Sequence, residues 1–245
     1  MRTVRIYCAG TLKLGAILAL DAHGISHVKV LRLKVGDPIR VFNGYGGEFS
    51  AKLHEISRHQ TTVQIIDYIE REVESSLKIH LGQVISRGDK MDFTIQKAVE
   101  LGVAEITPLF SERCGVKLDK TRLQKKLEHW QGVIISACEQ SGRNTLPILY
   151  EPKPLENWLA EQQGLRLALS PHADYAIVDL HKKNAQLKKV TLLIGPEGGF
   201  SPAEITLAKQ QAFLEVKLGP RVLRTETAAL VTIAILQSCW GDLAH

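Results

Sequence analysis

The sequence predicts an α/β fold in which a mainly parallel sheet flanked by helices follows a small N-terminal β domain. Two patterns of expected secondary structure along the sequence support this prediction. Short β-like runs separated by glycine turns fill residues 38–69, whereas strands alternate with helices after the polar stretch 70–76. The chain has 245 residues and is 44% hydrophobic, which is enough to bury a full core. We therefore expect two domains, residues 1–72 and residues 73–245.

The first domain is predicted as a small β-barrel or sheet preceded by a short helix. The helix is expected over residues 25–33, and strands are expected over residues 38–42, 48–56 and 62–66. A turn with three glycines, residues 44–47, separates the first two strands.

The second domain is predicted from apolar runs that alternate with helical patterns. Strands are expected over residues 78–86, 104–110, 165–169, 190–194 and 215–218. Asp89 is the expected N-cap of a helix, and further helices are expected over residues 123–139 and 227–239. Strands that read as continuous apolar runs are typical of a parallel sheet covered by helices on both faces.

Three junctions between a strand and a loop are the best places to look for a ligand, residues 169–172, 194–199 and 218–227. In open α/β sheets, ligands bind beyond the carboxyl ends of the strands. The middle junction holds three glycines and a proline, so its backbone can approach a ligand closely. Ser201, Pro202 and Glu204 then start a helix as a capping box. A tight strand-to-helix turn with no ligand would explain the same residues.

Several common site types are absent from the sequence. It contains no P-loop, no G-x-G-x-x-G turn and no G-x-S-x-G elbow, which disfavours nucleoside triphosphatases, dinucleotide dehydrogenases and esterases. The four cysteines form no C-x-x-C pair. His23 and His27 could share one helical face, but Gly24 weakens that helix, so we expect no metal site.

The sequence carries neither a signal-peptide core nor an apolar stretch long enough to span a bilayer. We therefore expect a cytoplasmic protein with no membrane partner. Its surplus of positive charge lies in residues 1–65, with nine lysines and arginines against four acids, while the rest balances at 22 against 22. This asymmetry would draw a polyanion to the N-terminal segment, although an ordinary solvated basic surface would look the same.

Two strings, Gly195-Pro196-Glu197-Gly198-Gly199-Phe200-Ser201 and residues 218–228, stand in this order about twenty residues apart. They closely resemble the knotted SPOUT family of RNA methyltransferases, in its branch that acts on ribosomal RNA. Residues 30–37 look like the N-terminal PUA-like domain of that branch, and residues 96–102 and 139–143 also match it. The resemblance implies a C-terminal trefoil knot, a homodimer and methylation of uridine N3 in 16S rRNA of the small ribosomal subunit.

The resemblance also implies that the cofactor, S-adenosyl-L-methionine, lies among the three loops. The residues expected to bind it are Leu169, Ser170, Pro171, Gly195, Pro196, Glu197, Gly199, Leu218, Gly219, Leu223 and Thr225. Backbone amides and carbonyls would read the adenine edge while apolar side chains cover its faces. Ordinary core packing would explain the leucines equally well.

Methylation of uracil N3 requires the imide proton to leave, so a base or a cation that stabilises the anion would help. The candidates are Arg143, Arg224, Glu139 and Glu226. Arg224 and Glu226 could instead form an ion pair that orders the loop, and Arg143 could be a solvated loop arginine. RNA contacts are expected from Arg2, Arg5, Arg32, Lys34 and Arg143.

Two other functions stay open at this point. A SPOUT enzyme could act on a ribose 2′-hydroxyl or a transfer-RNA base, because the cofactor loops do not define the acceptor. A non-catalytic RNA-binding ribosome assembly factor could keep the fold without the cofactor, but the presence of Gly195, Gly198 and Gly199 argues against it. The helix over residues 227–239 is apolar on nearly all sides, which suits either a dimer interface or burial within one subunit.

Overall fold

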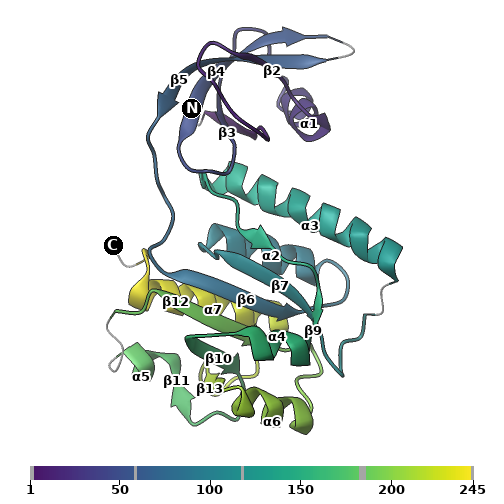
Figure 1. Cartoon of the computed structure of the whole chain (residues 1–245), viewed down its shortest axis with the longest axis vertical. Helices are drawn as coiled ribbons and strands as arrows, with labels where there is room; N and C mark the ends of the chain where they lie inside the picture. Colours follow the sequence, from purple (N-terminus) through teal and green to yellow (C-terminus); the bar gives the residue numbers. More distant parts are fainter. Residues whose placement is uncertain (1–2, 58–59, 117–118, 182–185, 244–245) are drawn as a thin grey trace. The chain divides into compact units, whose positions relative to one another are not determined.

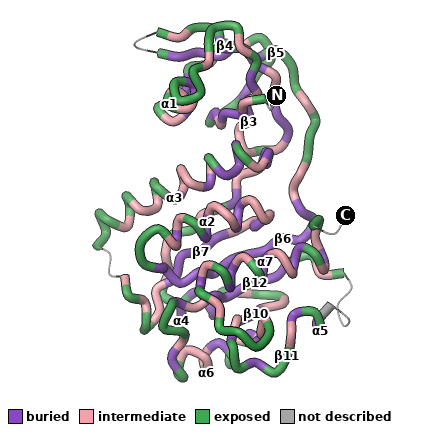
Figure 2. Tube along the Cα trace, turned by 180° about the vertical axis from the view of Figure 1, so that it is seen from behind, coloured by how far each residue is buried: buried purple, intermediate pink, exposed green. Residues whose placement is uncertain are grey.

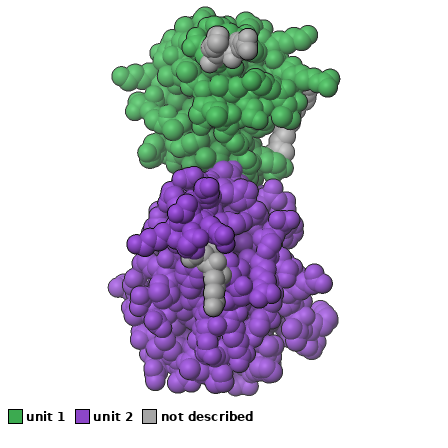
Figure 3. Space-filling model, turned by 90° about the vertical axis from the view of Figure 1, so that its right-hand side faces the viewer, with its two compact units in different colours: residues 1–74, 135–146 green, residues 75–134, 147–245 purple. Residues whose placement is uncertain are grey.

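A computed structural model of the chain describes residues 3–57, 60–116, 119–181 and 186–243. These residues divide into two compact units (Figures 1 and 3). Unit 1 comprises Met1–Glu74 and Ile135–Leu146, and unit 2 comprises Ser75–Ile134 and Pro147–His245. Unit 1 therefore takes in residues 135–146, a segment inside the range that the sequence suggested for the second domain.

Unit 1 is built on a five-stranded sheet with the order β1-β3-β4-β5-β2. The strands are β1 (Val4–Tyr7), β2 (Ile17–Ala19), β3 (Pro38–Phe42), β4 (Glu48–Ile56) and β5 (Thr61–Ile69). β1 pairs with β3 in parallel, and the other pairs are antiparallel. Alternate residues of these strands, among them Ile6, Val41, Leu53 and Val63, form one apolar core.

Helix α1 (Ala22–Val30) packs against β1 and begins three residues before the predicted start. Its N-cap is Asp21, whose Oδ1 accepts a hydrogen bond of 2.8 Å from the Gly24 backbone N–H. The helix forms with Gly24 inside it. A Cβ at Gly24 would lie 3.2 Å from Ile6 Cγ2, so the glycine allows α1 to approach the sheet closely.

Unit 2 contains a sheet with the order β11-β13-β10-β12-β6-β7-β8, and β9 pairs with β7. The strands are β6 (Lys78–Val84), β7 (Glu105–Phe110), β8 (Ile148–Leu149), β9 (Lys153–Pro154), β10 (Leu165–Leu169), β11 (Tyr175–Ala176), β12 (Lys189–Ile194) and β13 (Leu214–Lys217). Every described pairing in this sheet is parallel. The predicted parallel α/β architecture is confirmed.

The helices are α2 (Lys90–Glu100), α3 (Lys120–Ser141), α4 (Leu155–Glu161), α5 (Ile177–His181), α6 (Pro202–Gln210) and α7 (Thr225–Trp240). They cover both faces of the sheet. On β6, Gly82 faces the Trp158 ring of α4, while its neighbour Gln83 donates a hydrogen bond to Thr225 of α7. Because successive strand residues point to opposite faces, α4 and α7 lie on opposite sides.

The central strands of this sheet are buried along most of their length (Figure 2). On the α4 face the core includes Val84, Leu109, Trp158 and Leu193. On the other face α7 packs against α2 and α5. Within the part of the chain that the structure describes, no helix combines the length and apolar character needed to cross a bilayer. The trefoil knot implied by the resemblance stays a prediction.

Candidate functional site

A pocket of about 790 Å³ lies in unit 2 at the carboxyl ends of three neighbouring strands. Leu169 ends β10, Ile194 ends β12, and Leu218 directly follows β13, and all three residues line the pocket. β10 pairs with both β12 and β13, so the three loops that follow these strands converge. The pocket therefore occupies the position where ligands bind in parallel α/β sheets.

All eleven residues suggested as cofactor-binding line this pocket. They are Leu169, Ser170, Pro171, Gly195, Pro196, Glu197, Gly199, Leu218, Gly219, Leu223 and Thr225. Three segments separated by up to 56 positions in the sequence are thus brought together around one cavity. Their part in binding a cofactor stays a prediction.

The Thr225 hydroxyl holds the pocket loops in place. It donates a hydrogen bond of 2.6 Å to the Gly195 carbonyl and accepts one of 3.0 Å from Gln83 Nε2. Gln83 is fully buried on β6, and its Nε2 also donates to the Val84 carbonyl. The first residue of α7 is therefore tied both to the loop after β12 and to the buried Gln83 of β6.

Glycines give the loops conformations that other residues rarely adopt. Gly199 has φ +66° and Gly219 has φ +102°, both in the left-handed region. The Gly199 N–H donates to the Pro196 carbonyl at 2.9 Å, which closes a tight turn. Gly195 is crowded for another reason, because a Cβ there would lie 3.0 Å from the Phe200 ring.

Helix α6 starts where the sequence predicted, with Ser201 as its N-cap. The Ser201 hydroxyl accepts a hydrogen bond of 3.3 Å from the Glu204 N–H, and Glu204 Oε2 accepts one of 2.8 Å from the Ser201 N–H. Glu204 Oε1 also accepts a hydrogen bond of 2.8 Å from the Glu112 N–H in the loop after β7. The capping box is confirmed, and it also anchors a neighbouring loop.

Three cations that line the pocket were not among the predicted site residues, Lys90, Arg113 and Arg221. Lys90 Nζ lies 3.0 Å from Glu197 Oε1, and Arg113 Nη1 donates to the Gly198 carbonyl at 3.0 Å. Arg113 follows β7, another parallel strand, so the rule that selected the three loops would also have found it. Burial favours neutral Glu197, but hydrogen bonds from its own backbone N–H and from Lys90 outweigh this and lower the pKa of Glu197.

Arg224 and Glu226 lie at the start of α7. Arg224 lines the pocket and is exposed to solvent. Glu226 Oε2 is buried and has no hydrogen-bond partner among the described residues. The structure shows no ion pair between these two described side chains, which weakens the view that they only order the loop. Both stay predicted catalytic residues, and Arg224 is the one placed at the cavity.

Arg143 and Arg5 belong to a buried network inside unit 1. Arg143 is 4% exposed and pairs with Glu74, while Arg5 is 7% exposed and pairs with Glu48. One Arg5 nitrogen donates to the Arg143 carbonyl at 2.9 Å and to Asn144 Oδ1 at 2.7 Å. Arg143 is therefore not a solvated loop residue. Its burial and its carboxylate partner, like those of Arg5, argue against a direct phosphate contact in this conformation.

Arg32 and Lys34 are exposed in unit 1, as a contact to RNA requires, whereas Arg2 lies outside the described residues. Arg32 has φ +53° and directly follows the C-cap of α1. The Lys34 backbone N–H donates a hydrogen bond of 2.8 Å to Asp37 Oδ2.

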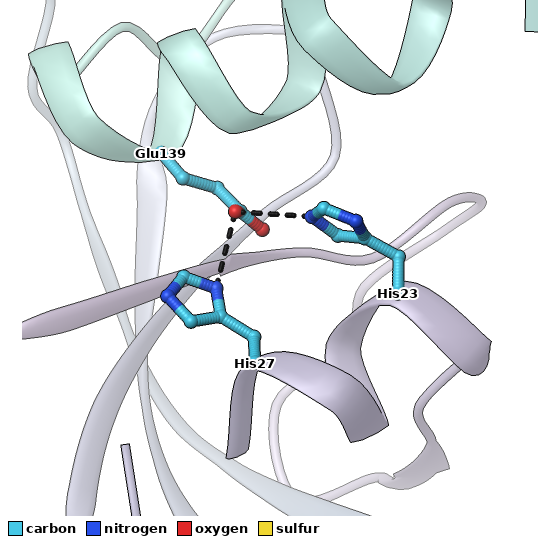
Figure 4. Close-up of side chains that lie close together, drawn as sticks. All are labelled: His23, His27 and Glu139. Atoms are coloured by element: carbon cyan, nitrogen blue, oxygen red, sulfur yellow. Dashed lines mark hydrogen bonds and ion pairs between the residues drawn. The ribbon is translucent and has the colours of Figure 1, made fainter. Parts of the chain in front are cut away.

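Glu139 is buried within unit 1 and meets two histidines of α1 (Figure 4). Its Oε2 lies 3.2 Å from His23 Nε2 and 3.1 Å from His27 Nδ1. Its Oε1 accepts a hydrogen bond of 3.0 Å from the Tyr7 N–H. The sequence placed the two histidines on one helical face but contained no local signal for a carboxylate more than a hundred residues away.

Comparison with known proteins places this geometry in a family. Residues 73–237 match the RNA methyltransferase domain, and residues 20–66 match the RNA methyltransferase PUA domain. The chain is 41% identical over 246 aligned residues to ribosomal RNA small subunit methyltransferase E from Buchnera aphidicola subsp. Schizaphis graminum, covering 99% of both chains. It is 30% identical to the protein of that name from Bacillus subtilis, covering 90% of this chain and 88% of that one.

Solved structures agree with the sequence comparison. A Legionella pneumophila protein solved with the bound cofactor SAM superimposes with a TM-score of 0.95 at 45% identity, covering 99% of this chain and 100% of that one. Ribosomal RNA small subunit methyltransferase E from Neisseria gonorrhoeae, solved bound to S-adenosyl methionine, superimposes with a TM-score of 0.91 at 37% identity. The match covers 99% of this chain and 100% of that one. The chain therefore belongs to the RNA methyltransferase family, and within it to the ribosomal RNA small subunit methyltransferases E.

Proposed function

We propose that this chain transfers a methyl group from S-adenosyl-L-methionine to N3 of a uridine in 16S ribosomal RNA. The pocket at the ends of β10, β12 and β13 carries the proposal. Its volume of about 790 Å³ is within the range of small-molecule sites, and three backbone-rich loops converge on it. Its residues match the family strings, and two close structural relatives were solved with this cofactor bound.

The pocket residues suit the adenosyl part of the cofactor. Backbone amides and carbonyls around Gly195 and Gly219 can form hydrogen bonds with the adenine edge. Leu169, Leu218 and Leu223 line the same cavity and can cover the faces of the ring. Each leucine is only partly buried, so these side chains keep apolar surface for a ligand.

S-adenosyl-L-methionine bound in this pocket would supply an electrophilic methyl group from its sulfonium. The uracil imide would lose its N3 proton to solvent water, and the N3 electron pair would form the new N–C bond as the C–S bond breaks, with S-adenosylhomocysteine as the leaving group. Arg224 lines the pocket and can stabilise negative charge on the uracil oxygens, which would contribute roughly a hundred- to ten-thousandfold in rate. Alignment of the two substrates contributes further.

We assign RNA binding to the N-terminal domain, residues 1–72, where the surplus of positive charge lies. Arg32 and Lys34 are its exposed candidates for phosphate contacts. Arg5 and Arg143 support this surface from within by pairing with Glu48 and Glu74. Because the substrate is ribosomal RNA, the protein acts in the cytoplasm.

We also propose a homodimer formed through α7. One side of this helix keeps apolar residues partly exposed, with Leu230, Val231 and Ala234 at helical spacing. Val231 is 36% exposed, although the opposite side of α7 is buried. Such an apolar stripe on a helix of the catalytic unit suits contact with a second copy.

The test is calorimetric titration of the purified protein with S-adenosylmethionine, followed by nucleoside analysis of particles containing 16S RNA. S-adenosylhomocysteine in place of the methyl donor is the matched control. New 3-methyluridine that depends on the donor would establish the proposal. A different methylated nucleoside would keep the cofactor site and discard the acceptor, whereas no binding would favour a non-catalytic assembly factor.

A further inference from the structure

A second polar site lies entirely within unit 1 and shares no residue with the cofactor pocket. His23 and His27 stand four apart on α1, and Glu139 is presented to them from the last turns of α3 (Figure 4). One ligand atom from each of the three residues lies within 4.8 Å of the other two. Two imidazoles and a carboxylate are a donor set that zinc and similar divalent transition metals prefer.

Two of the three distances between the ligand atoms agree with a shared metal ion. Ligand atoms bound at 2.0 to 2.1 Å in a tetrahedral site lie about 3.3 Å apart. Glu139 Oε2 is 3.2 Å from His23 Nε2 and 3.1 Å from His27 Nδ1. The two rings are steeply inclined to each other, with an interplanar angle of 68° and centroids 6.3 Å apart, so neither ring stacks over the other's nitrogen.

Hydrogen bonding does not account for the whole cluster. His27 Nδ1 is buried and makes no hydrogen bond of acceptable geometry to any described residue, although it faces Oε2. A buried ring nitrogen without a partner costs free energy, and a metal ion would use its lone pair. This nitrogen is the observation that favours a metal over a simple contact between a carboxylate and two imidazoles.

The surroundings hold the three ligands in place. The Tyr7 N–H donates to Glu139 Oε1 at 3.0 Å, which leaves Oε2 directed at the histidines. Such outer contacts orient the ligands of natural zinc sites. Asp21 caps α1, and Gly24 allows that helix to lie close to Ile6. The nearby cation Arg5 is paired with Glu48, which offsets its repulsion of a metal.

We propose that His23, His27 and Glu139 bind one divalent transition-metal ion of the zinc class, which joins α1 to the end of α3 within unit 1. A cavity of about 430 Å³ lies beside the three residues and is also lined by Ser26 and Gln140. It leaves a fourth position for water. The ion would stabilise the N-terminal unit and is not assigned a part in methyl transfer.

The test uses the full chain, freed of metal with a chelator and titrated with Co²⁺, whose visible absorption bands report tetrahedral coordination by nitrogen and oxygen. We expect one equivalent to bind, and Zn²⁺ to displace it. His23→Gln should weaken binding by more than about 100-fold, because it removes a direct ligand. His27→Gln and Glu139→Gln should do the same.

His54→Gln is the matched control, since His54 is an exposed histidine on β4 of the same unit. It should bind Co²⁺ like the unchanged protein. His23 is 37% exposed at its side chain, so we expect its replacement to leave the fold intact, and circular dichroism of the variant would check this. Absence of the absorption bands in the unchanged protein, or equal binding by His23→Gln and His54→Gln, would overturn the proposal.

Discussion

The Thr225 hydroxyl is a single group that connects the sheet, the glycine loop and the last helix. Thr225→Val keeps the side-chain shape but removes the hydrogen bond to the Gly195 carbonyl. Gln83 Nε2 keeps its bond to Val84, so the loss falls mainly on the loop. We expect about 1 to 2 kcal/mol weaker binding of S-adenosylmethionine, or roughly 5- to 30-fold in dissociation constant, measured by calorimetry.

The control for this change is Thr206→Val. The Thr206 hydroxyl also donates to a backbone carbonyl, that of Pro202 at 2.9 Å, but it is exposed on α6. This variant should bind the cofactor with unchanged affinity. If both variants bind alike, the Thr225 bond does not shape the pocket.

Arg224 provides the sharpest residue-scale test of the chemistry. Arg224→Ala should lower the turnover of methyl transfer by about 100-fold or more, because it removes a charge that stabilises the uracil anion. The melting temperature should hardly move, since Arg224 is exposed. Arg224→Lys should recover part of the rate. Arg122→Ala, which changes a 74% exposed side chain on α3, is the control and should keep full turnover.

The residues that could be predicted from the sequence are those whose neighbours along the chain define them. The three pocket loops follow apolar strands, so the strand rule selected the loops, whereas the individual glycines and leucines in them were expected only from the family resemblance. Glu139 is different, because it meets His23 across 116 positions of sequence. Arg143 likewise finds its partner Glu74 at a distance of 69 positions. A contact of this range leaves no periodic signal in either segment.

At the scale of elements, the packing of α4 on β6 depends on one missing side chain. A Cβ at Gly82 would run into the Trp158 ring, which is 1% exposed. Gly82→Ala should therefore lower the free energy of unfolding by about 1 to 3 kcal/mol through overpacking. Denaturant unfolding monitored by tryptophan fluorescence measures this change.

Gly132→Ala is the matched control, and it should change the free energy of unfolding in the opposite direction. Gly132 lies in α3, and a Cβ there would meet nothing within 4 Å. Alanine should stabilise this helix by up to about 1 kcal/mol. If Gly82→Ala were as harmless as Gly132→Ala, close approach of Trp158 would not be the reason for glycine on β6.

Elements with a clear apolar pattern were predicted well, including the four-residue strand β13, whereas α4 and β1 were not predicted. β10 was predicted with its observed bounds, and α7 within two residues, because each has a clear apolar pattern. α4 has only seven residues, which is too short for a helical period to show. β1 owes its place to parallel pairing with β3, a contact that spans more than thirty residues.

At the scale of the whole molecule, the proposed homodimer rests on the partly exposed apolar residues of α7. Val231→Glu places a charge on the proposed apolar contact, and burying it without a partner is costly. We expect the protein to shift from dimer to monomer in analytical ultracentrifugation. Val35→Glu, at a 59% exposed valine of unit 1, should leave the dimer intact. A monomeric unchanged protein would contradict the assignment.

The return of residues 135–146 to unit 1 has a consequence for the order in which the protein is made. Translation releases the chain from its N-terminus, so Arg5 and Glu48 leave the ribosome long before Asn144, with which Arg5 forms a hydrogen bond. The first segment of unit 1 ends at Glu74, but the ribosome must continue to Leu146 before all residues of unit 1 have been synthesised. A nascent chain ending before residue 135 would thus carry a sheet whose buried charges still lack their final neighbours.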